Sequence, residues 1–191
     1  MYEEKNAFNG DVHLAKKFLQ IKKDFSISTI IETGTFHGKT TEWFSRNFDY
    51  VYTAEVKPEH YQIAAESLSS LDNVKMFLDT SPSVLQQVLP VIDENKSIIF
   101  LDAHWYTNPV LDELVQIKKS GKKPILAIHD FQVPEHPELG YDQYPDQGIV
   151  YNWEWIQNHI ESIYGSDGYI KEYNEIATGA MRGCLFIFPK K

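Results

Sequence analysis

Five short apolar runs in this sequence are each followed at once by side chains that could bind a ligand or move a proton. These groups are Glu32-Thr33-Gly34-Thr35-Phe36-His37-Gly38, Glu55, Asp79-Thr80-Ser81, Asp102-Ala103-His104 and His129-Asp130. In an open sheet of parallel strands, ligands bind beyond the carboxyl ends of the strands. If the five runs are such strands, all these side chains occupy one edge of the sheet. The pattern therefore predicts a single composite site.

The segment after the first run contains two glycines and precedes an expected helix at 39–47. Gly34 and Gly38 permit a tight turn and a close backbone approach to a ligand, and the start of the helix offers free N–H groups. The segment is one residue shorter than the phosphate-binding P-loop pattern. Phe36 also replaces the middle glycine of the dinucleotide-binding pattern. These mismatches disfavour a nucleoside triphosphatase and a nicotinamide-dependent dehydrogenase.

The acids after the second and third runs are suited to binding a nucleoside. Glu55 can accept hydrogen bonds from the two hydroxyls of a ribose. Asp79 can contact the same ligand, or it can cap a helix that begins with Ser81 as N-cap and Pro82 as first residue. The sequence leaves both interpretations of Asp79 open.

Two acids and two histidines follow the fourth and fifth runs. These runs should form neighbouring strands, so Asp102, His104, His129 and Asp130 should lie together. Asp102 ends a buried strand and needs a partner, because an isolated buried charge is costly. His104 titrates near neutral pH and could act as a general base. A histidine near a sheet edge is about as often a hydrogen-bonded structural residue, so this alternative stays open.

The elements that would position these groups alternate between strands and helices. Predicted strands span 29–31, 50–54, 74–78, 97–101 and 124–128, and two more span 169–173 and 184–188. This alternation is typical of a parallel sheet that is covered on both faces. The last two runs have no helix between them, which indicates a hairpin and an antiparallel strand. We predict an α/β fold: a doubly wound, mostly parallel seven-stranded sheet with helices on both faces and an antiparallel last strand.

We expect a single domain over residues 1–191, because no repeat, linker or low-complexity tract divides the chain. Residues 1–27 should contain an N-terminal helix capped by Asp11. Residues 131–148 are too many for a simple connection and are the candidate acceptor-site loop. The alternative is a structural excursion packed by its own aromatic side chains. Arg182, in the turn between the last two strands, is expected to be solvated, and the alternative is that it holds an anionic group of the substrate.

The composition disfavours several classes of function. The formal net charge of −9 argues against binding to nucleic acid or to an anionic membrane, because phosphates would be repelled. Cys184 is the only cysteine, so an internal disulfide and a Cys-rich metal site are excluded. The sequence shows neither a signal-peptide pattern nor a run of ~20 apolar residues. We expect a cytoplasmic protein that acts on a small molecule; a homo-oligomer is left open.

The order of the motifs resembles the class I S-adenosylmethionine-dependent methyltransferases over nearly the whole chain. The matching features are E-x-G-x-x-x-G, an acid after the second strand, an acidic turn after the third, and an antiparallel end of the sheet. The resemblance implies that the glycine turn faces the methionine part of the cofactor. It also implies that the second-strand acid holds the ribose and that the third-strand turn lies by the adenine. The implied cofactor-binding residues are Glu32, Gly34, Thr35, Gly38, Glu55, Asp79, Thr80 and Asp102.

A narrower resemblance is to the metal-dependent sugar O-methyltransferases of the macrocin O-methyltransferase type. Those enzymes carry D-x-D after strand four and D-D after strand five, and they bind magnesium with acids of both motifs. Carried over, this implies Asp102, His129 and Asp130 as ligands of a divalent metal, and His104 as the catalytic base. Imidazole ligands suit Mn, Zn, Fe or Ni better than Mg. The identity of the metal, and whether one is needed, therefore stay open.

We predict an S-adenosylmethionine-dependent methyltransferase that methylates a hydroxyl group of a small acceptor such as a sugar. Displacement at a sulfonium mainly requires that the nucleophile, the methyl group and the leaving sulfur be aligned. A hydroxyl acceptor must also lose its proton. Two alternatives belong to other classes. One is a metal-dependent hydrolase that uses the Asp/His cluster without the cofactor, and the other is a non-catalytic binding protein with the same fold.

Overall fold

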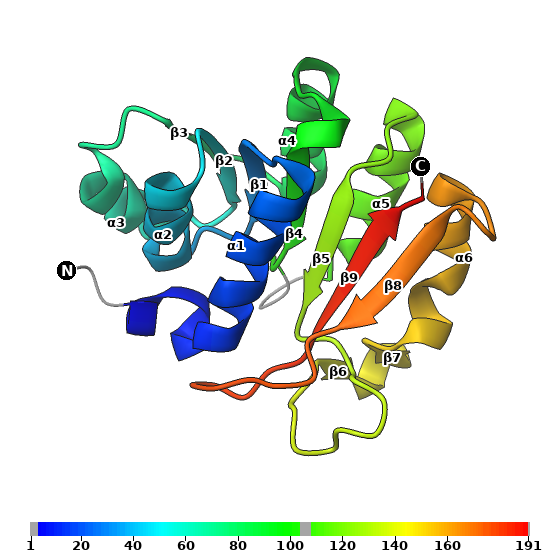
Figure 1. Cartoon of the computed structure of the whole chain (residues 1–191). Coiled ribbons are helices and arrows are strands. Elements are labelled where there is room, and N and C mark those ends of the chain that lie inside the picture. The colour runs from blue at the N-terminus through cyan, green and yellow to red at the C-terminus, as the bar shows by residue number, and fades with distance from the viewer. Residues whose placement is uncertain (1–3, 104–107, 191) are drawn as a thin grey trace.

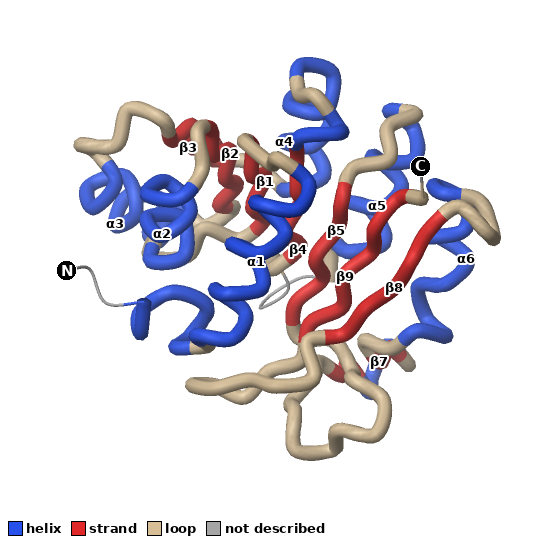
Figure 2. Tube along the Cα trace, in the orientation of Figure 1, coloured by secondary structure: helices blue, strands red, loops and turns tan. Residues whose placement is uncertain are grey.

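The core of the molecule is one seven-stranded sheet, seen in a computed structural model that describes residues 4–103 and 108–190 (Figures 1 and 2). Its strand order is β3-β2-β1-β4-β5-β9-β8. The strands are β1 Thr29–Thr33, β2 Tyr50–Glu55, β3 Val74–Leu78, β4 Ser97–Leu101, β5 Ile125–His129, β8 Tyr169–Tyr173 and β9 Cys184–Pro189. The first five are paired in parallel, whereas β9 lies antiparallel between β5 and β8. The predicted fold class is confirmed.

Helices precede the first strand, connect the parallel strands and lead into β8. They are η1 Glu4–Gly10, α1 Val12–Phe25, α2 Lys39–Asn47, α3 Pro58–Leu68, α4 Ser81–Val88, η2 Leu89–Val91, η3 Glu94–Lys96, α5 Val110–Ser120 and α6 Trp153–Tyr164. Asp11 caps α1, because its Oδ1 accepts hydrogen bonds from the N–H groups of His13 and Leu14. Among the residues that the structure describes, no helix combines the length and the apolar character needed to cross a membrane.

The start of α4 differs by one residue from the prediction. Thr80 is the N-cap and Ser81 is the first helical residue, so Pro82 occupies the second position. The cause is Asp79, whose carboxylate accepts hydrogen bonds from the Thr80 N–H at 2.7 Å and from the Ser83 hydroxyl at 2.6 Å. Asp79 thereby fixes the first turn, and the N-cap side chain makes no capping bond of its own.

The two faces of the sheet bury separate apolar clusters, because neighbouring residues of a strand point to opposite faces. α1 and α2 cover one face and contribute Phe18, Trp43 and Phe44. α4, α5 and α6 cover the other face, where Leu85, Leu114 and Ile160 are buried. All residues of β1, β4 and β5 are buried, as expected for central strands that are covered on both sides.

Three parallel strands extend past their predicted ends. β1 continues through Glu32 and Thr33, β2 includes Glu55, and β5 includes His129. The predicted ends stopped at the last apolar residue, but these polar side chains are themselves buried and hydrogen-bonded. They therefore belong to the strands and lie at the carboxyl-terminal edge of the sheet.

The segment after β5 and the turn before β9 are joined at the same edge of the sheet, below β5 and β8 in Figure 1. The segment contains β6 Gln143–Tyr144, η4 Pro145–Gln147 and β7 Ile149–Val150. Gly140 donates to the Met181 carbonyl at 2.7 Å, and Gly183 donates to the Gly140 carbonyl at 2.9 Å. Val133 and Leu139 share a small buried cluster with Ala177. Residues 131–148 are thus packed against the turn at 174–183.

Candidate functional site

A cavity of about 700 Å³ opens at the carboxyl ends of the parallel strands. This volume lies in the range of small-molecule sites. The cavity is lined by predicted cofactor-binding residues from four strand ends, namely Gly34, Thr35, Glu55, Asp79, Thr80 and Asp102. The other two, Glu32 and Gly38, are not among its lining residues. Residues far apart in the sequence are therefore brought together where the strand-end pattern predicts.

The glycine turn lies against the end of β4 and requires glycine at Gly34. This residue has φ +87°, and a Cβ atom there would lie 2.6 Å from the carbonyl oxygen of Asp102. Gly38 is the N-cap of α2 with φ +78°, and a Cβ atom would lie 3.0 Å from Leu68 of α3. The first glycine brings the turn close to β4 and the cavity, and the second lets α2 and α3 approach each other.

Glu55 lies at the end of β2 and is fixed by the backbone. Its Oε2 accepts the N–H of Phe36 at 2.8 Å, and its Oε1 accepts the N–H of Lys57 at 2.9 Å. The side chain is buried but lines the cavity. A carboxylate has about four acceptor positions, so two remain for hydroxyl groups of a ligand. The residue therefore has the chemistry required to hold a ribose.

Glu32 lies behind the glycine turn and takes no part in lining the cavity. Its Oε2 accepts hydrogen bonds from the hydroxyls of Thr41 and Thr53, and only 1% of the residue is exposed. Burial raises the pKa of Glu32 to about 8, although these two hydrogen bonds oppose the rise. The side chain links β1 to β2 and α2, so it can position the turn without touching a ligand.

The raised pKa of Glu32 makes the stability depend on pH. The folded chain binds this proton more tightly than the unfolded chain, so the free energy of unfolding falls as pH rises from about 4.5 to about 8. We expect the free energy of unfolding of Glu32→Gln, relative to that of the wild type, to increase by about 3 kcal/mol between pH 5 and pH 8. Urea denaturation of both proteins measures this. Glu66→Gln, on an exposed glutamate of α3, is the matched control, and a difference that does not change with pH would contradict the assignment.

Asn108 is a site residue that the sequence did not indicate. It lines the cavity, and its Oδ1 accepts the hydroxyl of Tyr151 at 2.7 Å. Its Nδ2 is buried and has no hydrogen-bond partner among the described residues. A buried donor without a partner costs about 1–3 kcal/mol, which a polar ligand atom would remove. No local motif marks such a residue, because its role depends on Tyr151, which lies 43 positions away.

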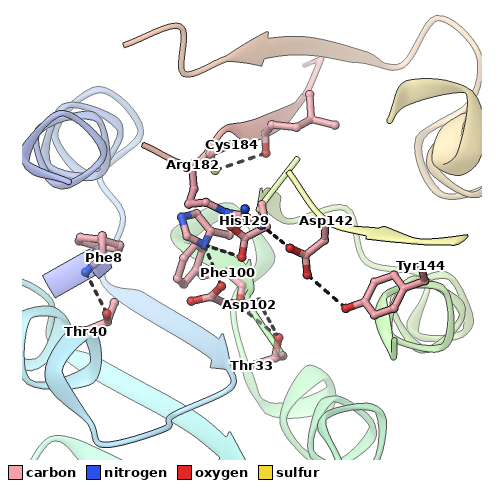
Figure 3. A network of polar contacts seen from close by, with 12 residues as sticks. Phe8, Thr33, Thr40, Phe100, Asp102, His129, Asp142, Tyr144, Arg182 and Cys184 are labelled. Atoms are coloured by element: carbon pink, nitrogen blue, oxygen red, sulfur yellow. Dashed lines mark hydrogen bonds and ion pairs between the residues drawn. The ribbon is translucent and has the colours of Figure 1, made fainter. Parts of the chain in front are cut away.

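The predicted metal ligands lie together at the ends of β4 and β5. Figure 3 labels two of them, Asp102 and His129. Asp102, His129 and Asp130 each offer one ligand atom, and these atoms lie within 4.8 Å of one another. Nδ1 of His129 is 2.9 Å from Oδ1 of Asp102 and 3.4 Å from Oδ2 of Asp130. Burial lowers the pKa of His129, but the two carboxylates outweigh it and hold the pKa well above its usual range. A metal cation bound by these three residues would replace the proton.

Arg182 is ion-paired, which corrects the expectation that it is solvated. Its Nε donates to Oδ1 of Asp130. Its Nη2 donates to Oδ1 of Asp142, and Figure 3 labels both of these residues. The sheet order explains the difference, because β9 pairs with β5 and carries the preceding turn to the end of that strand. A second cavity of about 490 Å³ lies here, lined by Asn9, Asp130, Asp142, Ala180 and Arg182.

The two cavities share one lining residue. Asn9 lines both, and the hydrogen bond between Asp102 and His129 connects the first cavity to the carboxylate of Asp130 in the second. The predicted base, His104, lies outside the described residues. The arrangement offers one site for a nucleoside-containing ligand and a polar site beside it.

The fold is that of the class I S-adenosylmethionine-dependent methyltransferases, as comparison with solved structures shows. An O-methyltransferase from Bacillus cereus in complex with S-adenosylhomocysteine matches with a TM-score of 0.62 and 21% identity, covering 93% of this chain and 81% of that one. The O-methyltransferase TomG from Streptomyces achromogenes, involved in tomaymycin synthesis and solved with S-adenosylmethionine, matches with a TM-score of 0.60 and 16% identity, covering 93% and 80%.

The same fold also serves a very different acceptor. An rRNA methylase from Streptococcus thermophilus matches with a TM-score of 0.54 and 15% identity, covering 94% of this chain and 95% of that one. No protein-family model matches the sequence. A search of curated proteins finds no sequence relative. The acceptor must therefore be argued from the site itself.

Proposed function

We propose that this chain transfers a methyl group from S-adenosylmethionine to a hydroxyl group of a small polar acceptor, such as a sugar. The observation that carries the proposal is the large cavity at the carboxyl ends of β1, β2 and β4, where Glu55 and the turn at Gly34 meet. Their order and placement are those that the sequence predicts for a class I methyltransferase cofactor site.

The residues present fit this cofactor. The turn at Gly34 leaves room for close approach, since a Cβ atom would fill the space beside Asp102. Glu55 offers a fixed carboxylate for the ribose hydroxyls. Asn108 lines the same cavity, and its buried Nδ2 donor has no partner among the described residues. These groups supply both hydrogen-bond acceptors and a donor around one ligand of nucleoside size.

The bound cofactor supplies an activated methyl group on a sulfonium. The protein then has to hold the acceptor hydroxyl in line with that methyl group and to exclude water. In our proposal Glu55 fixes the ribose, and Asp79 and Thr80 lie by the adenine. Asp102 lies near the reacting end, because it belongs both to the cofactor cavity and to the cluster with His129. We keep His104 as the proposed base, since it follows Asp102 by two positions in the sequence.

The acceptor would occupy the second cavity. Of its lining residues only Ala180 is apolar, and the others can donate or accept hydrogen bonds. Arg182 shares its charge with Asp130 and Asp142, so the local charge does not favour a strongly anionic acceptor. A neutral molecule with several hydroxyls matches this mixture of donors and acceptors. In this proposal residues 131–148 form the acceptor-site loop, because Asp142 in this segment lines the second cavity.

A divalent cation also fits between the cavities. Asp102, His129 and Asp130 could hold it, and a bound cation would make the proton of an acceptor hydroxyl easier to remove. The same cluster is what a metal-dependent hydrolase would use. The cofactor cavity beside it favours the methyltransferase.

The test is binding of S-adenosylhomocysteine by calorimetry, followed by transfer of radiolabelled methyl groups to a panel of sugars and glycosides. We expect micromolar binding and labelling of at least one sugar. Binding without transfer to any acceptor class would favour the non-catalytic binding protein. Absence of binding, with and without divalent metal, would refute the methyltransferase and leave the metal enzyme as the explanation.

A further inference from the structure

We infer that the cluster of Asp102, His129 and Asp130 binds a transition-metal dication of the zinc or nickel class and discriminates against magnesium. The inference rests on the proposed function only for the role of the ion beside the acceptor. Binding itself is measured without S-adenosylmethionine, so the two proposals can fail separately.

The imidazole of His129 lies between the two carboxylates. Nδ1 of His129 is 2.9 Å from Oδ1 of Asp102 and 3.4 Å from Oδ2 of Asp130. A cation that contacts both carboxylates therefore also meets this nitrogen. Magnesium prefers oxygen ligands in near-octahedral geometry, whereas zinc and nickel bind imidazole well. The donor set thus contains a ligand that magnesium uses poorly.

Two of the three ligands are buried. Only 1% of His129 and 5% of Asp130 are exposed, and only Asp102 reaches the cofactor cavity. Magnesium gives up its water shell reluctantly and usually keeps several waters when it binds to a protein. The cluster meets the first cavity at Asp102 and the second at Asp130, whereas His129 lines neither cavity and closes its own side to water. Zinc needs only about four ligands in total and tolerates this enclosure.

The charge on Asp130 is partly compensated by an arginine. Arg182 donates from Nε to Oδ1 of this carboxylate, and the same guanidinium pairs with Asp142. The ion pair holds Asp130 in place, as outer partners of metal ligands commonly do. It also reduces the negative charge available to a hard cation. Magnesium depends mainly on that charge, whereas a nitrogen ligand stabilises zinc or nickel without it.

The test compares zinc and magnesium binding by calorimetry in the wild type and in His129→Asp, both in the full chain and without tags. His136→Asp is the matched control, because His136 is a partly exposed histidine of the neighbouring loop that pairs with Glu138. We expect the ratio of zinc to magnesium affinity to fall at least 100-fold in His129→Asp and to stay unchanged in His136→Asp. An unchanged ratio in His129→Asp, or no zinc binding by the wild type, would overturn the inference.

A second measurement needs no variant. Crystals of the wild type grown with zinc should show an anomalous peak at the zinc absorption edge within about 2.1 Å of Nδ1 of His129. A peak bound only by carboxylates, or no peak at this cluster, would contradict the inference. Binding of S-adenosylhomocysteine is measured in parallel. Zinc at the cluster without that binding would refute the proposed methyltransferase and leave the metal site standing.

Discussion

Glu55→Ala should weaken the binding of S-adenosylhomocysteine by at least about 100-fold in calorimetry. The carboxylate is held by the N–H groups of Phe36 and Lys57 and presents its remaining acceptor positions to the cavity. A hydrogen bond to a charged group contributes about 1.5–3 kcal/mol, and a ribose offers two hydroxyls. A combined loss of about 3 kcal/mol corresponds to a factor of more than 100 in the dissociation constant.

The matched control for this substitution is Glu59→Ala. Glu59 lies in the first turn of α3, is exposed and does not line the cavity, so its loss should leave the affinity unchanged. Glu55→Gln should bind more weakly than the wild type but better than Glu55→Ala, because an amide keeps one acceptor oxygen. If Glu55→Ala binds as tightly as Glu59→Ala, the ribose lies elsewhere and the placement of the cofactor in this cavity is wrong.

The sheet could be predicted because its central strands are buried on both faces. The apolar run at 97–101 begins and ends where the central strand β4 does, and the predicted edge strands at 74–78 and 169–173 have the bounds of β3 and β8. The missing helix before the last run correctly indicated an antiparallel end. The errors occur where a polar residue is buried, as at Glu32 in β1. Its burial depends on hydroxyls of Thr41 and Thr53, and hydropathy along the chain contains no information about such partners.

The candidate site could be predicted in part, because strand ends meet at one edge whatever the details of packing. This places Glu55, Asp79 and Asp102 around one cavity. Contacts across the fold could not be predicted. Arg182 reaches Asp130 only because β9 lies beside β5, and its position in a turn indicated a solvated side chain. The role of a polar side chain whose partner lies 40 or more positions away can be inferred only when the strand order is known.

Gly34→Ala should both destabilise the chain and abolish detectable binding of S-adenosylhomocysteine. The new Cβ atom would lie 2.6 Å from the carbonyl oxygen of Asp102 and 3.1 Å from the Cα of Ala103. Both are backbone atoms at the end of β4, so no side chain can rotate away. The chain must move there, which displaces Asp102 and narrows the cavity. Local strain of this kind costs about 1–3 kcal/mol.

Two causes contribute to the expected loss of stability in Gly34→Ala: the left-handed backbone and the contact of the new Cβ atom with the end of β4. Gly121→Ala measures the first cause alone. Gly121 has φ +71° at the end of α5, and nothing lies within 4 Å of the position of its Cβ atom. Its substitution costs only the left-handed conformation, about 1–2 kcal/mol, and should leave binding intact. Urea denaturation and calorimetry on both variants therefore isolate the contact with β4. Equal losses of stability, with binding retained in Gly34→Ala, would show that this close approach does not shape the site.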